Sequence, residues 1–199
     1  MSTKIVLQNV VISFPNLFTP RAPKGSDTVR YSASLILPQN VDWSAIKTAV
    51  ATATAEKWPQ GAPATLKSQI SQVMEGPYKG HYAISANASV DHKPTTVDQN
   101  LAPIMDTSAI FAGCIVNAQV SFFGYDKGSN GVGVGLNMVQ LVKSDGVTRL
   151  DNTQAAEEVF GKIAGAPPVT TAQAPTDAPV QTPVDSAPPV TAEADQPWN

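Results

Sequence analysis

The 199-residue chain has one cysteine, two histidines and no long apolar run. A single thiol, Cys114, can form neither an internal disulfide nor a cysteine-rich metal site, which fits a reducing cytoplasm. We expect Cys114 to be a small buried apolar residue within a strand. Because no stretch of about 18 apolar residues occurs, we expect no transmembrane helix and no membrane partner. No signal peptide is apparent at the N-terminus.

Catalytic motifs are missing as well. The chain lacks G-x-S-x-G, G-x-x-x-x-G-K-S/T, H-E-x-x-H and paired cysteines, which mark several classes of hydrolase, nucleotide-binding protein and metalloenzyme. His81 and His92 could suggest a metal, but no ligand spacing around them supports one, so we expect no metal site and no cofactor. An enzyme needs a defined constellation of reactive groups. We therefore interpret the chain as a binding protein and not as an enzyme.

Negative charge is concentrated at one end of the chain. The net charge is −3, from 13 basic and 16 acidic residues. Residues 164–199 contain four of the acidic residues and no lysine or arginine, so residues 1–163 hold 13 basic and 12 acidic residues, a net charge of +1. The low pI of about 5.3 therefore comes from this end, and it does not exclude a body that binds nucleic acid.

The composition changes at Ala164. Eight of the last 36 residues are proline and eight are alanine, and APPVT occurs at 166–170 and again at 187–191. Such a segment cannot bury enough apolar surface to offset its ordering entropy, so we expect one domain at 1–163 and a disordered Pro/Ala-rich acidic tail at 164–199. Glu193, Asp195 and Trp198, near its end, are candidates for a peptide that docks on a protein partner. The alternative is a plain solubilising tail.

Apolar periodicity predicts a mainly β protein with one or two helices. The predicted strands are 4–13, 30–37, 81–88, 111–125 and 132–142, and the last two are joined by a hairpin turn at 126–131. A helix capped by Asn40 or Asp42 runs to about Lys57, and a short helix follows Asp151 or Thr153 to about Phe160. We expect a loop at 14–30 and an irregular connection at 94–109, while residues 64–76 are ambiguous.

The segment 111–125 is the central strand of this prediction. Val116, Val120 and their period-2 neighbours form an apolar face, whereas the opposite face is polar and ends in Phe123 and Tyr125. Aromatic rings on a wet sheet face can stack on unpaired nucleic-acid bases; the alternative is that they pack under a loop or in an interface. The next strand contains Gly131, Gly133 and Gly135, and glycine inside a strand indicates a bulge or the close approach of another backbone.

Five strands with a helix between the second and the third are compatible with an OB-type, five-stranded Greek-key barrel, and one face of such barrels binds single-stranded oligomers. Four segments strengthen this interpretation: NVVISFPNLFTPR, RYSASLILP before the helix, GHYAISANAS, and FAGCIVNAQVSFFGYDKGSNGVGVGLNMVQLV. In this order they resemble a family of tailed-phage single-stranded DNA-binding proteins, over about residues 4–160.

The resemblance implies a variant OB-fold with an unstructured C-terminal segment, in which aromatic stacks and basic side chains hold the DNA. Carried over to this sequence, it favours Phe123 and Tyr125 as stacking residues, with Tyr31 as a further candidate whose face could also belong to the core. The candidate DNA-contacting polar residues are Arg21, Lys24, Arg30, Lys79, His81, Lys93 and Lys127.

The function that we expect is therefore to coat single-stranded DNA, without strong sequence preference, during phage DNA replication or recombination in the cytoplasm of the infected host cell. The tail would recruit replication or recombination proteins, and an oligomer is compatible with the sequence. Two other classes stay open. One is a β-sheet interaction or carbohydrate-binding accessory module of a phage, because OB-folds also bind oligosaccharides. The other is a nuclease without a recognisable motif.

Overall fold

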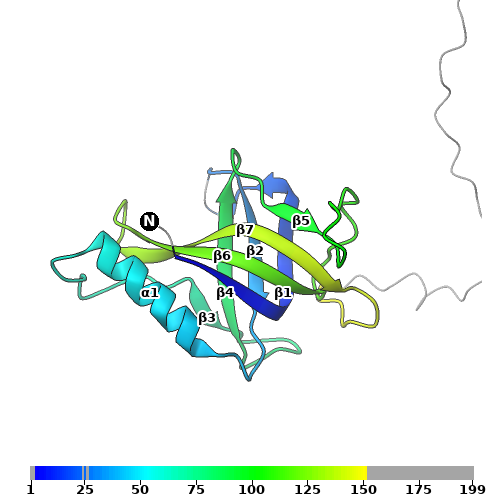
Figure 1. Cartoon of the computed structure of the whole chain (residues 1–199), viewed down its shortest axis with the longest axis horizontal. Coiled ribbons are helices and arrows are strands. Elements are labelled where there is room, and N and C mark those ends of the chain that lie inside the picture. Colours follow the sequence, from blue (N-terminus) through cyan, green and yellow to red (C-terminus); the bar gives the residue numbers. More distant parts are fainter. Residues whose placement is uncertain (1–2, 24, 26, 152–199) are drawn as a thin grey trace, which may run out of the picture. The chain divides into compact units, whose positions relative to one another are not determined.

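The computed structural model describes residues 3–23, 25 and 27–151 (Figure 1). These residues form strands packed against one helix, as predicted. In chain order the elements are β1 (Thr3–Arg21), β2 (Arg30–Ile36), α1 (Trp43–Lys57), β3 (Ile70–Gln72), β4 (Tyr82–Ser89), β5 (Thr95–Val97), β6 (Ile115–Tyr125) and β7 (Gly131–Lys143).

Five of the strands close into a barrel. Antiparallel pairs place them in the order β4-β2-β1-β6-β7, and a parallel bridge between Asn87 of β4 and Gly135 of β7 completes the ring. Three consecutive barrel strands are adjacent, and β6 then returns to lie beside β1, which is the Greek-key arrangement of an OB-fold. The predicted fold class is thus confirmed, with the helix inserted between the second and third barrel strands (Figure 1).

Closure between β4 and β7 depends on one short segment. The two strands meet only at the Asn87–Gly135 bridge, and the gap beside it is filled by residues 67–72. The Lys67 amide donates to the Asn130 carbonyl (2.9 Å), the Val132 amide donates to the Lys67 carbonyl (3.0 Å), and β3 pairs with β4. The ambiguous residues 64–76 therefore contain a seam-filling strand. Likewise, the predicted irregular connection 94–109 contains β5, which pairs with β7.

The prediction of a loop over 14–30 is wrong for residues 14–21, which continue β1. Two register shifts interrupt the pairing of this part with β2, and Phe14 has a positive φ of 48°. After Val11 the strand β1 no longer pairs with β6. Pro15 and Pro20 lack the amide hydrogen that a paired strand would need, but β6 does not pair with this part of β1, so no hydrogen bond to it is lost. Prolines are tolerated at such edges and bulges.

The helix α1 begins as predicted, because Asp42 caps it by accepting a hydrogen bond from the Ser44 amide at 2.8 Å. Its buried residues Ile46, Ala49 and Ala53 belong to the same core as the barrel strands. The helix runs alongside β1 and β6 in Figure 1. A methyl group at Gly124 of β6 would collide with Cβ of Lys57, so this glycine permits the helix end to approach the strand closely.

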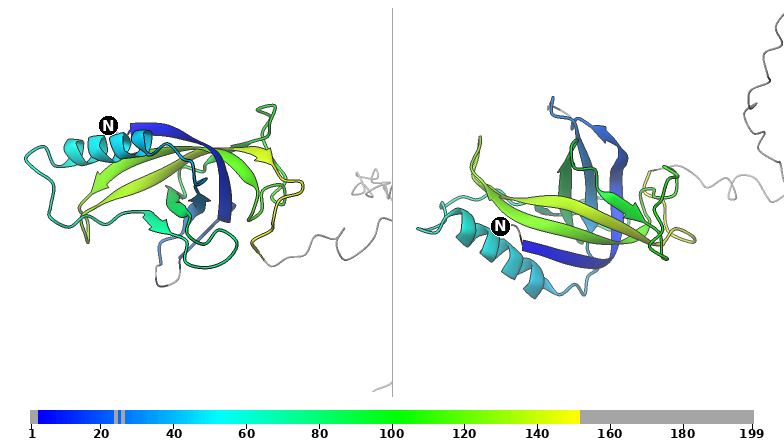
Figure 2. Two further views of the ribbon diagram at one scale, coloured as in Figure 1. Left: turned by 90° about the horizontal axis from the view of Figure 1, so that it is seen from below. Right: turned by 45° about the horizontal axis from the view of Figure 1, so that its top comes forward.

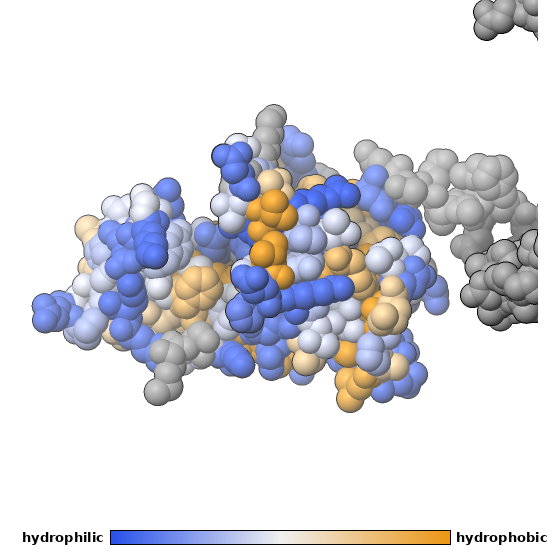
Figure 3. All heavy atoms as spheres, turned by 90° about the horizontal axis from the view of Figure 1, so that it is seen from above, coloured by the Kyte–Doolittle hydropathy of each residue, from blue (hydrophilic) through white to orange (hydrophobic). Residues whose placement is uncertain are grey.

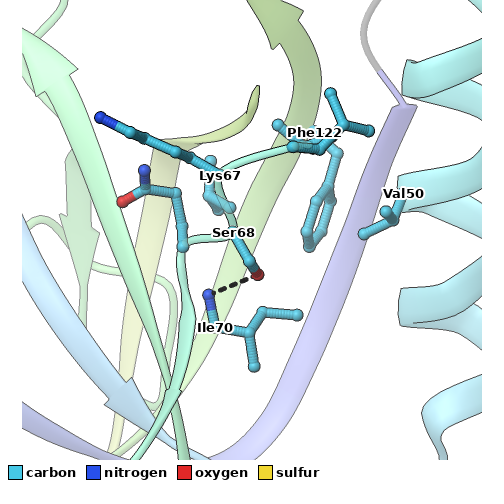
Figure 4. A pocket seen from close by; sticks show the side chains of 9 residues that line it. Val50, Lys67, Ser68, Ile70 and Phe122 are labelled. Atoms are coloured by element: carbon cyan, nitrogen blue, oxygen red, sulfur yellow. Dashed lines mark hydrogen bonds between the residues drawn. The ribbon is translucent and has the colours of Figure 1, made fainter. Parts of the chain in front are cut away.

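The barrel interior is built from alternate strand residues. Cys114 is buried as expected, and burial raises the pKa of its thiol. It is not within a strand, however, because the predicted strand 111–125 begins only at Ile115. Phe122 is 1% exposed and points toward Val50 of α1 across a small apolar cavity of about 80 Å³ (Figure 4). Residues 66–70 cover this cavity, and Ser68 Oγ accepts a hydrogen bond from the Ile70 amide there (3.0 Å).

Some sequence predictions lie outside the described residues. These are the short helix from about Asp151 to Phe160, the domain boundary at 163/164 and the nature of the tail. Among residues 3–23, 25 and 27–151, no helix is long and apolar enough to cross a membrane. In the same part of the chain, no three histidine, cysteine or acidic side chains gather as a metal site would require.

The adjacent pair Phe122 and Phe123 tests the assignment of inner and outer faces. Phe122→Ala removes a fully buried ring and should lower the free energy of unfolding by about 3–5 kcal/mol. Phe123, 42% exposed, should lose far less when truncated. Denaturant unfolding monitored by circular dichroism measures both; equal losses in the two variants would contradict the assignment.

Candidate nucleic-acid interface

A groove of about 350 Å³ lies over the seam between β4 and β7. Its lining comes from five places in the sequence: Arg30, Gln69, Asn87, Phe123, Tyr125, Gly133 and Val134. The β6–β7 hairpin supplies one wall, and β2 with β4 supplies the other; Figure 2 (right) shows these two groups of strands. Three residues predicted to contact DNA, Arg30, Phe123 and Tyr125, are thus brought together.

The two rings lie on the outer face of β6. Their strand partners on β7 are glycines, Gly133 opposite Phe123 and Gly131 opposite Tyr125. A methyl group at Gly133 would lie 2.6 Å from Cζ of Phe123, and one at Gly131 would lie 2.6 Å from the Tyr125 hydroxyl. The rings therefore lean over β7 where a side chain would otherwise stand. The close approach that glycine predicted comes from these rings and, at Gly131, also from a neighbouring backbone, because the Lys67 carbonyl oxygen would lie 2.7 Å from the added methyl group.

Arg30 places an unpaired cation at the groove. It is half-buried, and its Nε is buried without a hydrogen-bond partner in the described structure. Arg21 of β1 stands directly opposite Arg30, and like charges in that position repel each other. An anion bound at this end of the barrel would satisfy the orphaned donor and relieve the repulsion.

The hairpin that carries the rings is tied to the helix. Lys57 of α1 forms an ion pair with Asp126 at 2.9 Å. The hydrogen bond from Lys57 holds the pKa of Asp126 below its usual value, so this carboxyl group is ionised at neutral pH. Lys127, the next residue, is exposed at the hairpin turn, two residues beyond Tyr125.

Lys93 lies at the end of the barrel where β1 and β2 are joined. Its ammonium is 5.6 Å from the centre of the Phe18 ring, a cation–π distance. The preceding loop begins after Ser89, which pairs with Arg30. Lys93 therefore belongs to the same end of the barrel as Arg21 and Arg30.

The remaining predicted residues are placed elsewhere. Tyr31 shares the inner face of β2 with Ala33 and Leu35 and is 8% exposed, so it presents no ring face for stacking. Lys79 and His81 precede β4, at its end remote from Ser89, and His81 lines a different hollow. Lys24, together with the tail residues Glu193, Asp195 and Trp198, lies outside the described residues.

The charge of the barrel wall is of one sign. The five barrel strands carry four cations and no aspartate or glutamate; the cations are Lys4, Arg21, Arg30 and Lys143. The acidic residues of the described chain thus lie in loops and on α1. On the face seen from above, hydrophilic residues lie around a narrow hydrophobic strip near the middle, and a second hydrophobic area lies at the lower right (Figure 3).

Sequence reasoning missed Gln69, Asn87 and Lys67. The first two line the groove with amides, and the Lys67 main chain pairs with β7 beside Tyr125. Lys67 extends away from Phe122 and Val50 in Figure 4. Asn87 had a detectable signal, because it alternates onto the polar side of its strand. Gln69 and Lys67 had no such signal, because the sequence of their segment shows no clear hydrophobic periodicity.

An OB-type barrel with two aromatic rings and an arginine in one groove has the features of OB-fold proteins that bind single-stranded polymers. The model of the family described as "Enterobacter phage Enc34, ssDNA-binding protein" matches residues 3–168, and the chain belongs to this family. Protein p50 of Acyrthosiphon pisum secondary endosymbiont phage 1 is 29% identical over 173 residues, which cover 80% of this chain and 94% of that protein.

Solved structures support the fold. The single-stranded DNA-binding protein of bacteriophage Enc34, in complex with single-stranded DNA, superposes with a TM-score of 0.61 at 20% identity, covering 71% of this chain and 87% of that one. The single-stranded DNA-binding protein gp2.5 of bacteriophage T7 gives a TM-score of 0.55 at 12% identity, covering 77% and 98%. At these identities the likeness concerns the fold alone.

The packing of Phe123 on Gly133 has a spectroscopic consequence. The Gly133 Hα resonances should carry a ring-current shift, which Phe123→Leu should remove. Gly128, with open space around it, is the control and should not change. A ¹H–¹³C correlation spectrum of both proteins measures the shifts, and unchanged Gly133 resonances would show that the ring does not rest on the glycine.

Proposed function

We propose that this protein binds single-stranded DNA in the groove over the β4–β7 seam. The observation that carries the proposal is the meeting of the Phe123 and Tyr125 rings with Arg30 in one open groove. Membership in a family described as phage single-stranded DNA-binding proteins supports the choice of ligand.

Bases stack on the two rings, and phosphates contact the cations around them. Each base stacked on an aromatic side chain contributes about 1–3 kcal/mol, as judged by alanine substitution, and the contact tolerates any base because every base has a flat face. The glycines of β7 seat the rings before the ligand arrives, which lowers the ordering cost of binding. The amides of Asn87 and Gln69 can donate to and accept from base edges without selecting one base.

Electrostatics supplies the second component. Arg30 and Arg21 take one phosphate position, and Lys93 and Lys127 take positions at the two sides of the groove. Each phosphate contact to a single strand contributes about 0.7 to the slope of log affinity against log salt concentration. With these three contacts the slope is about −2, so the affinity falls as the salt concentration increases.

The role that follows is that of a non-catalytic coat. The protein protects unpaired DNA, without strong sequence preference, while phage DNA is replicated or recombined inside the infected host cell. Glu193, Asp195 and Trp198 are proposed to dock replication or recombination proteins. The supporting observation is the composition of residues 164–199, which separates an acidic end from the acid-free strands of the barrel.

Fluorescence anisotropy with a labelled single-stranded oligonucleotide tests the groove. Phe123→Ala and Tyr125→Ala should each weaken binding by about 5- to 150-fold, which corresponds to 1–3 kcal/mol of stacking. Arg30→Gln should weaken binding at low salt and reduce the salt slope by about 0.7. Tyr82→Leu is the matched control: Tyr82 is an exposed aromatic that packs on Trp43, away from the groove, and its loss should leave affinity unchanged.

Three results would contradict the proposal. Equal affinity for the Tyr125→Ala variant and the unmodified protein would exclude the rings as the stacking surface. Binding of a neutral oligosaccharide without salt dependence, in place of DNA, would favour a carbohydrate-binding module. Degradation of the DNA probe on addition of a divalent metal would identify a nuclease.

A further inference from the structure

A second hollow, of about 340 Å³, lies on the outer side of the same barrel. It has an aliphatic floor, from Val11, Ile36, Leu37 and Pro38, and a rim of Asn9, Gln39, Tyr78 and His81. Its volume is close to that of the groove over the seam, about 350 Å³, and both fall in the lower part of the range for ligand sites, about 300–1,000 Å³. Among the residues that the structure describes, none with an acidic side chain lines it.

The rim of this hollow is firmly built. His81 Nδ1 donates a hydrogen bond to the Tyr78 carbonyl (3.1 Å), and the two rings meet edge to face with their centres 5.5 Å apart. Lys79 follows Tyr78 and is exposed. An ordered ring above an aliphatic floor, with amides at the edge and a lysine next to the ring in the chain, matches the chemistry of a nucleotide, which has an apolar face, polar edges and an anionic phosphate.

One face of β2 joins the two sites. Arg30, at one end of that face, lines the groove over the seam, and Ile36, at the other, lines the second hollow. Between them the outward residues are Ser32 and Ser34. Six residue steps at about 3.3 Å separate the ends, so the sites lie about 20 Å apart along the strand.

The neighbouring strands continue the same polar surface. Ser32 pairs with Asn87 of β4 and Asn16 of β1, and Ser34 pairs with Ser85 of β4 and Ser13 of β1. This set of residues, which we call the serine strip, consists of small hydroxyl and amide side chains: Ser13, Asn16, Ser32, Ser34, Ser85 and Asn87. It contains no negative charge that would repel a phosphate backbone and no large side chain that would block its path.

We propose that the Tyr78–His81 hollow is a second nucleotide-binding subsite, reached by the same DNA strand after it leaves the groove and crosses the serine strip. The inference rests on the proposed function, because the groove supplies the first contact. The occupant follows from the continuity of the two hollows along β2 and from the acid-free strip between them. His81 and Lys79, which lie apart from the groove, thereby gain a place on the strand's route.

Binding as a function of DNA length distinguishes the two sites. Oligothymidylates of about 4 and about 16 nucleotides bracket the site sizes of single OB folds. Tyr78→Ala should weaken binding of the 16-mer by about fivefold or more, as expected for the loss of one stacked base, and should leave the 4-mer unaffected. Phe123→Ala should weaken binding of both. Met74→Ala is the matched control, because Met74 is exposed in the same segment but does not line the hollow.

A second variant tests the subsite by an increase in affinity, which misfolding could not produce. Gln39→Lys adds a cation at the rim of the hollow and should tighten binding of the 16-mer, but not of the 4-mer, at low salt. If Phe123→Ala weakens both oligonucleotides while Tyr78→Ala and Gln39→Lys change neither, the second subsite is excluded and the groove stands. If Phe123→Ala has no effect on either length, the proposed function itself fails.

Discussion

The structure depends on how a barrel closes between two parallel strands that diverge. β4 and β7 touch at the single Asn87–Gly135 bridge, and everything beside that bridge must be supplied by other residues. On one side, residues 67–72 restore main-chain pairing and cover the core at Phe122. On the other side β5 pairs with β7. The groove lies over the side that residues 67–72 fill, because Gln69 of that segment and Gly133 of β7 both line it, and its position follows from the fold.

The groove is shaped by residues without side chains. Gly131 and Gly133 let the neighbouring rings incline across β7, and Gly124, on the opposite face of the hairpin, lets α1 approach from behind. Lys57 then fixes the turn through Asp126. The rings are therefore supported from beneath by β7, while the strand that carries them is supported from the back by the helix.

Much of this fold could be predicted from the sequence, because five strands alternate with period 2 and Asp42 marks the helix start. The outer placement of Phe123 and Tyr125 followed from the same alternation. Tyr31 shows the limit of that reasoning: alternation separates two faces but does not state which one is inside, and this ring proved to be buried. The extension of β1 through Pro15 and Pro20 could not be foreseen either, since it depends on where the partner β6 ends.

Contacts between residues that lie far apart in the sequence could not be predicted. Gln69 enters the groove because its segment fills a seam, and no local pattern marks a seam. Arg30 was recognisable as a cation, but its position directly opposite Arg21 depends on the register between β1 and β2. The glycines of β7 were visible in the sequence, whereas their partners across the hairpin became clear only from the pairing of β6 with β7.

The acid-free strands have a consequence for motion along the surface. A polyanion lying on the barrel meets no repulsive point between one register and the next, and serine hydroxyls can exchange one phosphate oxygen for another at little cost. On the proposed route, bound DNA would therefore shift along the surface in small steps without dissociating. Such a surface would favour rapid redistribution of the protein over unpaired DNA, and the proposed stacking on Phe123 and Tyr125 would anchor it.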